Sequence, residues 1–123
     1  MKLTETEEQL MDFIWEKGHT FMKDIIESYP EPKPAPTTVA TLLKRMQNKG
    51  FVGYKLMGNS RQYHPLVKKS AYFSKHVNGL IKNFFGSSAM QFASFFTTET
   101  DLTSKELEDL RKIIDNEIKR KKQ

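Results

Sequence analysis

Three helix patterns followed at once by a two-strand pattern constrain the fold of this chain more than any other feature. Residues 4–18 open with a capping-box pattern and end at a glycine, which predicts a first helix. A second helix is expected over residues 22–29, because its apolar positions recur at helical spacing. Prolines alternate through residues 30–36 and predict a stiff, extended loop. A third helix over residues 37–48 then leads into a hairpin over residues 51–64.

The third predicted helix separates an apolar face from a polar one. Its apolar stripe consists of Val39, Leu42, Leu43 and Met46. This spacing is typical of a helix face that is buried in a core. The outward face then consists of Thr37, Thr41, Lys44 and Asn48, with Thr38 and Arg45 at its margins. Short hydroxyl side chains near a helix N-terminus suit phosphates and thymine edges, and long cations suit phosphates, so this face predicts contacts with a nucleic acid.

The charge of the chain is concentrated in its middle. The 123 residues carry a net charge of +5. Residues 1–31 are acidic, with eight Asp or Glu against three Lys, and residues 99–123 carry seven side chains of each sign. Residues 32–98 hold ten Lys or Arg and no Asp or Glu. A polyanion binds best to cations that have no competing carboxylates, so this block favours a nucleic-acid partner over the alternative of a merely basic surface.

The C-terminal third carries three amphipathic helix patterns but few residues for a core of its own. The helices are expected over residues 67–85, over residues 89–96, and after a capping box at Thr103 and Glu106. Their apolar positions, which we expect to form dimer contacts, are Phe73, Val77, Leu80, Ile81, Phe84, Phe92, Phe95, Phe96, Leu107, Leu110 and Ile114. A second copy of the chain would bury these stripes most simply, so we expect a homodimer. The alternative is a monomer whose helices fold back on the N-terminal half.

The order of the elements is that of a winged helix, a helix-turn-helix variant whose recognition helix enters the major groove of DNA. We therefore expect a mainly α fold with a small β-hairpin. A winged helix-turn-helix DNA-binding domain is expected over residues 1–66 and a helical dimerisation domain over residues 67–123. Lys55 and Arg61 flank the tip of the hairpin and are expected to contact the DNA backbone or the minor groove.

These residues resemble the BlaI/MecI family of bacterial penicillinase repressors over nearly the whole chain. The central motif of the resemblance consists of Pro36-Thr37-Thr38-Val39, Thr41-Leu42, Arg45-Met46 and Lys49-Gly50-Phe51. The resemblance implies winged-helix dimers that silence β-lactam resistance and related operons. It also implies that the first turns of the recognition helix contact operator DNA, here through Thr37, Thr38, Ala40 and Thr41. Ala40 stands where the best-known members carry Arg, so the operator read by this chain is expected to differ from theirs.

The resemblance also implies a route of induction. In those members a sensor-linked protease cuts an Asn-Phe bond in the penultimate helix. The matching proteolytic site here is Phe95-Phe96, where the Asn is missing and the second residue is kept. The alternative is that both phenylalanines pack in the dimer core. Copper-responsive relatives carry a Cys-x-Cys pair, and this chain has no Cys, so copper sensing through thiolates is excluded.

Other classes of function find little support in the sequence. His19, His64 and His76 are far apart along the chain, and the basic block between them offers no carboxylate, so no metal site is predicted. A glycine-rich phosphate loop and a nucleophile with a paired base are both missing, so we expect neither an enzyme nor a cofactor. No apolar run approaches the roughly 20 residues of a membrane span, so the chain is expected in the cytoplasm, away from the membrane.

The sequence thus favours a cytoplasmic, homodimeric repressor that binds a dyad-symmetric operator in double-stranded DNA. In this hypothesis Thr37, Thr38 and Thr41 face the bases or nearby phosphates. The residues that neutralise phosphates are Lys44, Arg45, Lys55 and Arg61. The alternative is a winged-helix scaffold that binds an acidic protein partner without specific DNA binding. DNA is favoured because the third helix shows no outward aromatic or aliphatic anchor of the kind that protein interfaces use.

Overall fold

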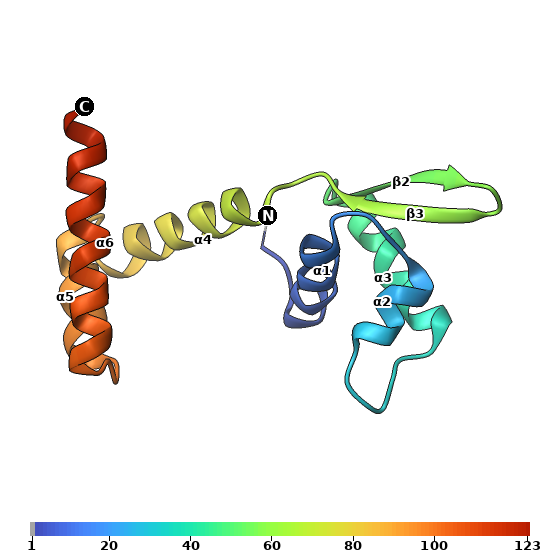
Figure 1. The fold of residues 1–123 in the computed structure, drawn as a ribbon. Coiled ribbons are helices and arrows are strands. Elements are labelled where there is room, and N and C mark those ends of the chain that lie inside the picture. Colours follow the sequence, from blue (N-terminus) through green and yellow to red (C-terminus); the bar gives the residue numbers. More distant parts are fainter. Residues whose placement is uncertain (1) are drawn as a thin grey trace. The chain divides into compact units, whose positions relative to one another are not determined.

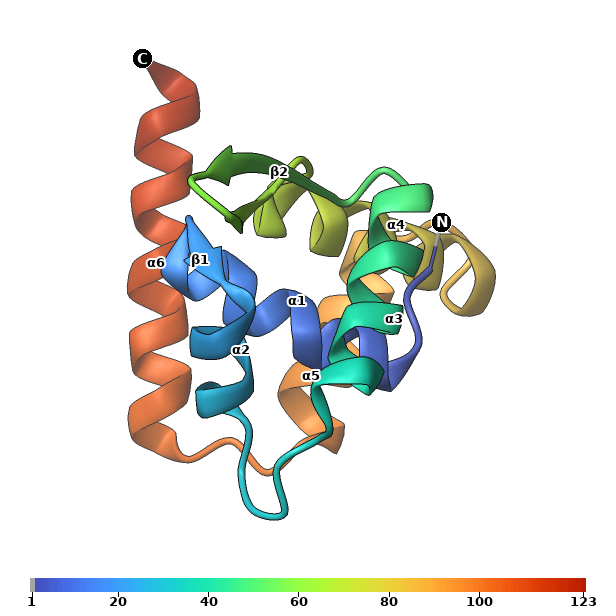
Figure 2. The ribbon, with the colours of Figure 1, turned by 90° about the vertical axis from the view of Figure 1, so that its right-hand side faces the viewer.

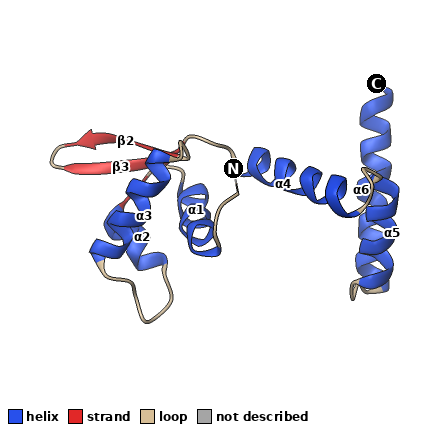
Figure 3. Ribbon diagram, turned by 180° about the vertical axis from the view of Figure 1, so that it is seen from behind, coloured by secondary structure: helices blue, strands red, loops and turns tan. Residues whose placement is uncertain are grey.

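The computed structural model describes residues 2–123, which form six helices and three strands (Figures 1 and 3). The elements are, in chain order, α1 (Glu5–Lys17), β1 (Thr20–Phe21), α2 (Met22–Ser28), α3 (Pro36–Asn48), β2 (Val52–Met57), β3 (Ser60–Pro65), α4 (Lys69–Phe84), α5 (Ala89–Glu99) and α6 (Ser104–Lys122). The predicted fold class, mainly α with a small β element, is confirmed. Contacts divide the chain into an N-terminal unit that ends at His76 and a C-terminal unit over Val77–Gln123.

The strands of the N-terminal unit form one antiparallel sheet in the order β1-β3-β2. β2 and β3 make the predicted hairpin, in which Tyr54 lies opposite Tyr63. β1 adds a third strand that the prediction of a simple hairpin lacks, and it pairs Thr20 with Tyr63. A strand of two residues leaves no periodic pattern in a sequence, so only the partner strand reveals it. At the hairpin turn Gly58 has a φ of 66°, the conformation that glycine adopts freely at the first central position of a tight turn.

The core of the N-terminal unit lies between the sheet and helices α1, α2 and α3, which contact one another (Figure 2). The predicted apolar stripe of α3 is buried and is confirmed as its inward face. It packs with Leu10, Met11 and Ile14 of α1, all of them fully buried. The Lys33 ammonium donates to the Glu27 and Tyr29 carbonyl oxygens at 3.0 and 2.8 Å, which fixes the proline-rich loop ahead of α3.

The first two turns of α4 belong to the N-terminal unit. The Tyr72 ring is buried, and its hydroxyl accepts from the Leu3 backbone N–H at 2.9 Å and donates to Glu8 Oε2 at 3.0 Å. Phe73, which the sequence assigns to the dimer contacts, is half-buried and packs on this core, with its ring 6.0 Å from that of Trp15. Because these aromatic residues pack on the core, the N-terminal unit continues to His76, beyond the boundary after residue 66 that the sequence indicates.

The C-terminal unit holds the end of α4 together with α5 and α6. The Phe85 ring lies 5.5 Å from the rings of both Phe92 and Phe95. The predicted capping box is present, since the Thr103 hydroxyl and the Glu106 carboxylate each accept from the other residue's backbone N–H. No residue of α5 or α6 is buried, so a single copy of this unit leaves most of its apolar side chains in solvent.

Candidate nucleic-acid interface

The polar face of α3 is exposed as the sequence analysis expects. Thr37, Thr38, Ala40, Thr41, Lys44 and Arg45 are all exposed to solvent. The helix opens on Pro36, which has no N–H, and the Thr38 and Val39 N–H groups both donate to the Ala35 carbonyl oxygen, at 3.0 and 3.2 Å. The Ala35 N-cap has no side chain that could accept from the remaining first-turn amide, that of Thr37. An unsatisfied helix N-terminus that points N–H groups at solvent attracts a phosphate oxygen. The start of α3 therefore combines the Thr37 N–H with the side chains of the three threonines.

The Thr41 hydroxyl is already committed as a donor. It donates to the Thr37 carbonyl oxygen, four residues earlier in the helix, at 2.9 Å. Its oxygen lone pairs and its methyl group remain for a ligand. A base edge that meets Thr41 is therefore expected to present either a donor, such as an exocyclic amino group, or the thymine methyl group.

Behind this face a buried carboxylate holds two of the cations. Glu7 is fully buried, and it accepts hydrogen bonds from Lys49 Nζ at 2.7 and 2.9 Å and from the Thr4 backbone N–H at 2.9 Å. The Arg45 guanidinium lies 3.6 Å from the same carboxylate, with 48% of its side chain exposed. Arg45 is thus shared between Glu7 and the surface that we expect to meet phosphates.

The charge state of Glu7 follows from these contacts. Burial alone would raise the pKa of this carboxyl group, but the hydrogen bonds from Lys49 and Thr4, together with the Lys49 charge, outweigh burial and lower its pKa below the usual range. Glu7 therefore remains ionised at neutral pH. In the sequence Glu7 stands out only as part of a helix cap, and its contact with Lys49 leaves no local pattern, because the two residues are 42 positions apart.

The hairpin of β2 and β3, which we call the wing, carries its two cations at the surface. Lys55 and Arg61 are both exposed. The Arg61 guanidinium carbon lies 4.3 Å from the centroid of the Tyr54 ring, a cation–π contact that lays this side chain along the hairpin. Tyr54 and Leu56 are exposed on this hairpin and are further functional candidates. The signal for them in the sequence is that the tip has more apolar residues than a solvated hairpin needs.

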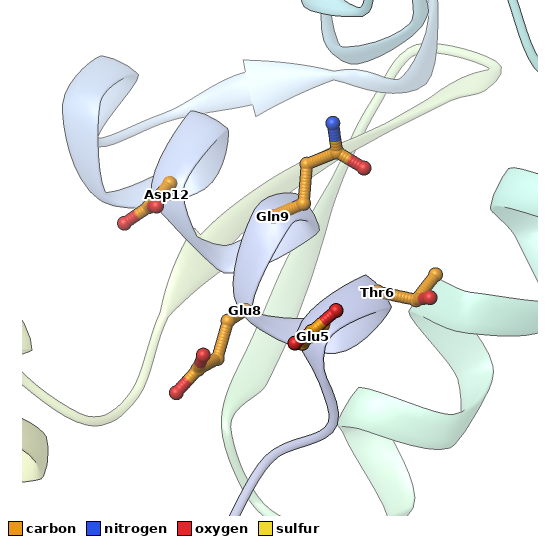
Figure 4. A pocket seen from close by; sticks show the side chains of 5 residues that line it. All are labelled: Glu5, Thr6, Glu8, Gln9 and Asp12. Atoms are coloured by element: carbon orange, nitrogen blue, oxygen red, sulfur yellow. The ribbon is translucent and has the colours of Figure 1, made fainter.

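The exposed face of α1 is acidic and unsuited to a polyanion. Figure 4 shows Glu5, Glu8 and Asp12 lining a shallow hollow along this helix, together with Thr6 and Gln9. Carboxylates repel phosphates, so this side of the N-terminal unit opposes DNA binding. The polar face of α3 and the wing are therefore the surfaces of this unit whose charge suits DNA.

Two histidines that are distant in the sequence meet at the sheet. The His19 and His64 rings have centroids 5.7 Å apart, whereas His76 lies elsewhere and stacks on Tyr72. The sequence gives no sign of this pair, because only the pairing of β1 with β3 brings His19 beside His64. Within residues 2–123 no group of three or more His, Asp or Glu side chains is placed to hold a metal ion.

The residues expected in dimer contacts are mostly exposed in one copy of the chain. Those classed as exposed are Val77, Leu80, Phe84, Phe95, Phe96, Leu107 and Ile114, while Ile81, Phe92 and Leu110 are half-buried. Phe84 is 76% exposed. The Phe95-Phe96 bond lies inside α5, with both rings accessible from solvent. None of the helices within residues 2–123 combines the length and apolar character that crossing a lipid bilayer requires.

Comparisons with known proteins show which family the chain matches and which solved fold it resembles. The family model described as penicillinase repressor matches residues 3–116. The methicillin resistance regulatory protein MecI of Staphylococcus aureus (strain N315) is 29% identical over 114 residues, 92% of this chain and 93% of that protein. The penicillinase repressor of Bacillus licheniformis is 21% identical over 123 residues, 99% of this chain and 96% of that protein. The solution structure of the DNA-binding domain of the repressor BlaI superposes with a TM-score of 0.51 at 24% identity, covering 58% of this chain and 88% of that domain.

Proposed function

Because the chain belongs to the penicillinase repressor family, whose members are DNA-binding transcriptional repressors and not enzymes, we propose that it represses transcription as a homodimer on a dyad-symmetric operator. The exposed polar face of α3 is the observation that carries this proposal. It offers threonines, the Thr37 N–H at the helix start and cations within a stretch, residues 32–98, that contains no Asp or Glu. Such a surface is complementary to the phosphates and base edges of a major groove.

Two groups of residues have different proposed roles. Thr37, Thr38 and Thr41, with Ala40 between them, face the bases or the nearest phosphates. Lys44, Arg45, Lys55 and Arg61 neutralise phosphates on either side of the groove. Phosphate contacts fix the position of the protein, and base contacts select the sequence. Because its partner is operator DNA, the repressor acts in the cytoplasm.

The homodimer is supported by the exposed apolar residues of the C-terminal unit. In one copy, α5 and α6 bury no residue, although each carries an apolar stripe. A second copy would cover these stripes and present two α3 helices to half-sites about one helical turn apart, or a multiple of that.

The names of the relatives support a proposal for the controlled operon, and the family resemblance supports one for its induction. MecI is named a methicillin resistance regulatory protein and the Bacillus licheniformis relative a penicillinase repressor, so we propose a β-lactam-resistance-like or related operon as the target. A sensor-linked protease that cuts between Phe95 and Phe96 would remove the repressor. Both rings are exposed in one copy but belong to the proposed dimer contacts, so the protease would reach this bond only where those contacts open. The Asn of the cleaved family members is replaced here by Phe95.

Fluorescence anisotropy tests the proposal directly. The full chain would be titrated onto the DNA upstream of its own gene and onto a scrambled duplex, at several salt concentrations. We expect tighter binding to the upstream DNA and a steep salt dependence, because each neutralised phosphate releases counterions. Equal, weak binding to both duplexes would contradict the proposal and favour the alternative, a scaffold for an acidic protein.

A further inference from the structure

The tip of the wing is apolar on both faces, a feature that the proposed phosphate contacts leave unused. Leu56 is 68% exposed and Met57 is 50% exposed. They lie next to each other in β2 and so point to opposite faces of the hairpin, Leu56 opposite Arg61 and Met57 opposite Ser60. One exposed apolar side chain needs no partner. Two adjacent ones beside the turn of a protruding hairpin form a wedge that water solvates poorly.

The cations around this wedge favour an anionic partner. Lys55 precedes Leu56 in β2, and Arg61 faces Leu56 from β3. The wing itself lies within the acid-free stretch of residues 32–98. A hydrophobic protein surface would gain nothing from these cations, which would have to be desolvated against it. Duplex DNA satisfies both features, because it is a polyanion whose stacked bases accept apolar side chains.

The geometry of one face of the wing favours the minor groove. Arg61 and Leu56 are cross-strand neighbours, and the Arg61 guanidinium rests 4.3 Å from the Tyr54 ring centroid. The ring therefore holds a cation beside an apolar side chain. Arginine is attracted to a narrow minor groove, and leucine can enter between base pairs at a flexible step.

We propose that Leu56 inserts against a base step in the minor groove beside each half-site, with Arg61 in the same groove. This inference rests on the proposed function. Partial unstacking costs least at TA and CA/TG steps, so the wing makes the repressor prefer such steps at positions that α3 does not reach. Leu56 is then a specificity determinant that acts through DNA deformability and makes no hydrogen bond to a base.

The test uses the full chain and the DNA upstream of its own gene, with 2-aminopurine placed at each adenine that flanks the footprinted half-sites. Its fluorescence rises when the base is unstacked. The variant is Leu56→Thr, since Thr is a good strand former that keeps the hairpin but is too short and polar to wedge. The matched control is Leu66→Thr, which changes another exposed leucine, 57% exposed and just beyond β3.

We expect the wild type and Leu66→Thr to raise the fluorescence at one flanking step. Leu56→Thr should abolish that rise and weaken binding about tenfold, with an unchanged salt slope because no charge is removed. Replacing the TA or CA step with AA should weaken the wild type but not Leu56→Thr. Selective binding by all three proteins with equal affinity and no fluorescence change would overturn the wing inference alone. Unselective binding by the wild type would instead overturn the proposed function, and with it this inference.

Discussion

Removal of the Lys49 ammonium should destabilise the N-terminal unit far more than removal of the neighbouring Arg45 guanidinium. Lys49→Met keeps the length of the side chain but leaves the Glu7 carboxylate fully buried without its 2.7 Å partner. Breaking a buried ion pair on one side costs about 3–5 kcal/mol, since the remaining charge is uncompensated. The N-cap hydrogen bond from Thr4 and the half-exposed Arg45 guanidinium, 3.6 Å away, offset only part of this cost.

The control variant is Arg45→Met. Its guanidinium lies 3.6 Å from Glu7 and is 48% exposed, so solvent screens the pair and its loss should cost about 0–1 kcal/mol. A second variant, Glu7→Gln combined with Lys49→Met, should recover part of the lost stability, because no buried charge is left unpaired. The three variants together separate the cost of an orphaned charge from the cost of lost packing.

Urea unfolding followed by tryptophan fluorescence measures these differences. Trp15 is the one tryptophan of the chain, packs against the core of the N-terminal unit, and donates from Nε1 to the Val67 carbonyl oxygen at 2.8 Å. Its emission therefore reports the unfolding of the unit that contains Glu7. A loss of 3 kcal/mol would remove a large share of the roughly 5–15 kcal/mol typical of a small domain. If Lys49→Met and Arg45→Met lowered the unfolding free energy equally, the reasoning would be refuted.

Three further predictions address pH, DNA contacts and assembly. The ion pair of Glu7 should contribute its full stability above the ordinary carboxyl pKa of 4.5, and this stability should be lost as the pH falls through the lower pKa that Glu7 has in the folded protein. Urea midpoints at a series of pH values should show this loss in the wild type and not in Glu7→Gln. Lys44→Ala should weaken binding to every duplex by a similar factor and lower the salt slope by about one, whereas a bulky residue at Thr41 should change which operator is preferred, both measured by anisotropy. Phe84→Ser should raise the dimer dissociation constant about tenfold or more in sedimentation experiments, because this ring is 76% exposed in one copy and available to a second. The urea transition that Trp15 reports should stay unchanged. An unchanged dissociation constant would argue against a C-terminal dimer contact.

Local features of the fold follow from the sequence with good accuracy. The capping boxes at Thr4 and at Thr103 are both present, because their hydrogen bonds join residues only three positions apart. The buried stripe of α3 is equally local, since its periodicity alone separates the inward face from the outward one. The exposed polar face that carries the proposed DNA contacts is the complement of that stripe.

Features that depend on distant residues could not be predicted in the same way. Glu7 looks like an ordinary capping residue, and only the packing of α1 on α3 shows that it also holds Lys49. Likewise, β1 is too short to show a pattern, so neither the third strand nor the meeting of His19 and His64 could be foreseen. Phe73 fits the apolar stripe of α4, but the periodicity of that stripe does not show that this residue packs on the core of the N-terminal unit.

The first two turns of α4 determine where a chimaera between this repressor and a relative should be joined. The Tyr72 ring fills the core of the N-terminal unit, and its hydroxyl satisfies the Leu3 N–H and reaches Glu8. A chimaera joined after residue 66 would take α4 from another protein and lose the match between Tyr72 and this core. The compact N-terminal unit ends at His76, so we expect the transferable DNA-binding domain to extend to that residue. We expect a chimaera to carry over the proposed operator preference only when it includes the first half of α4 together with residues 2–68.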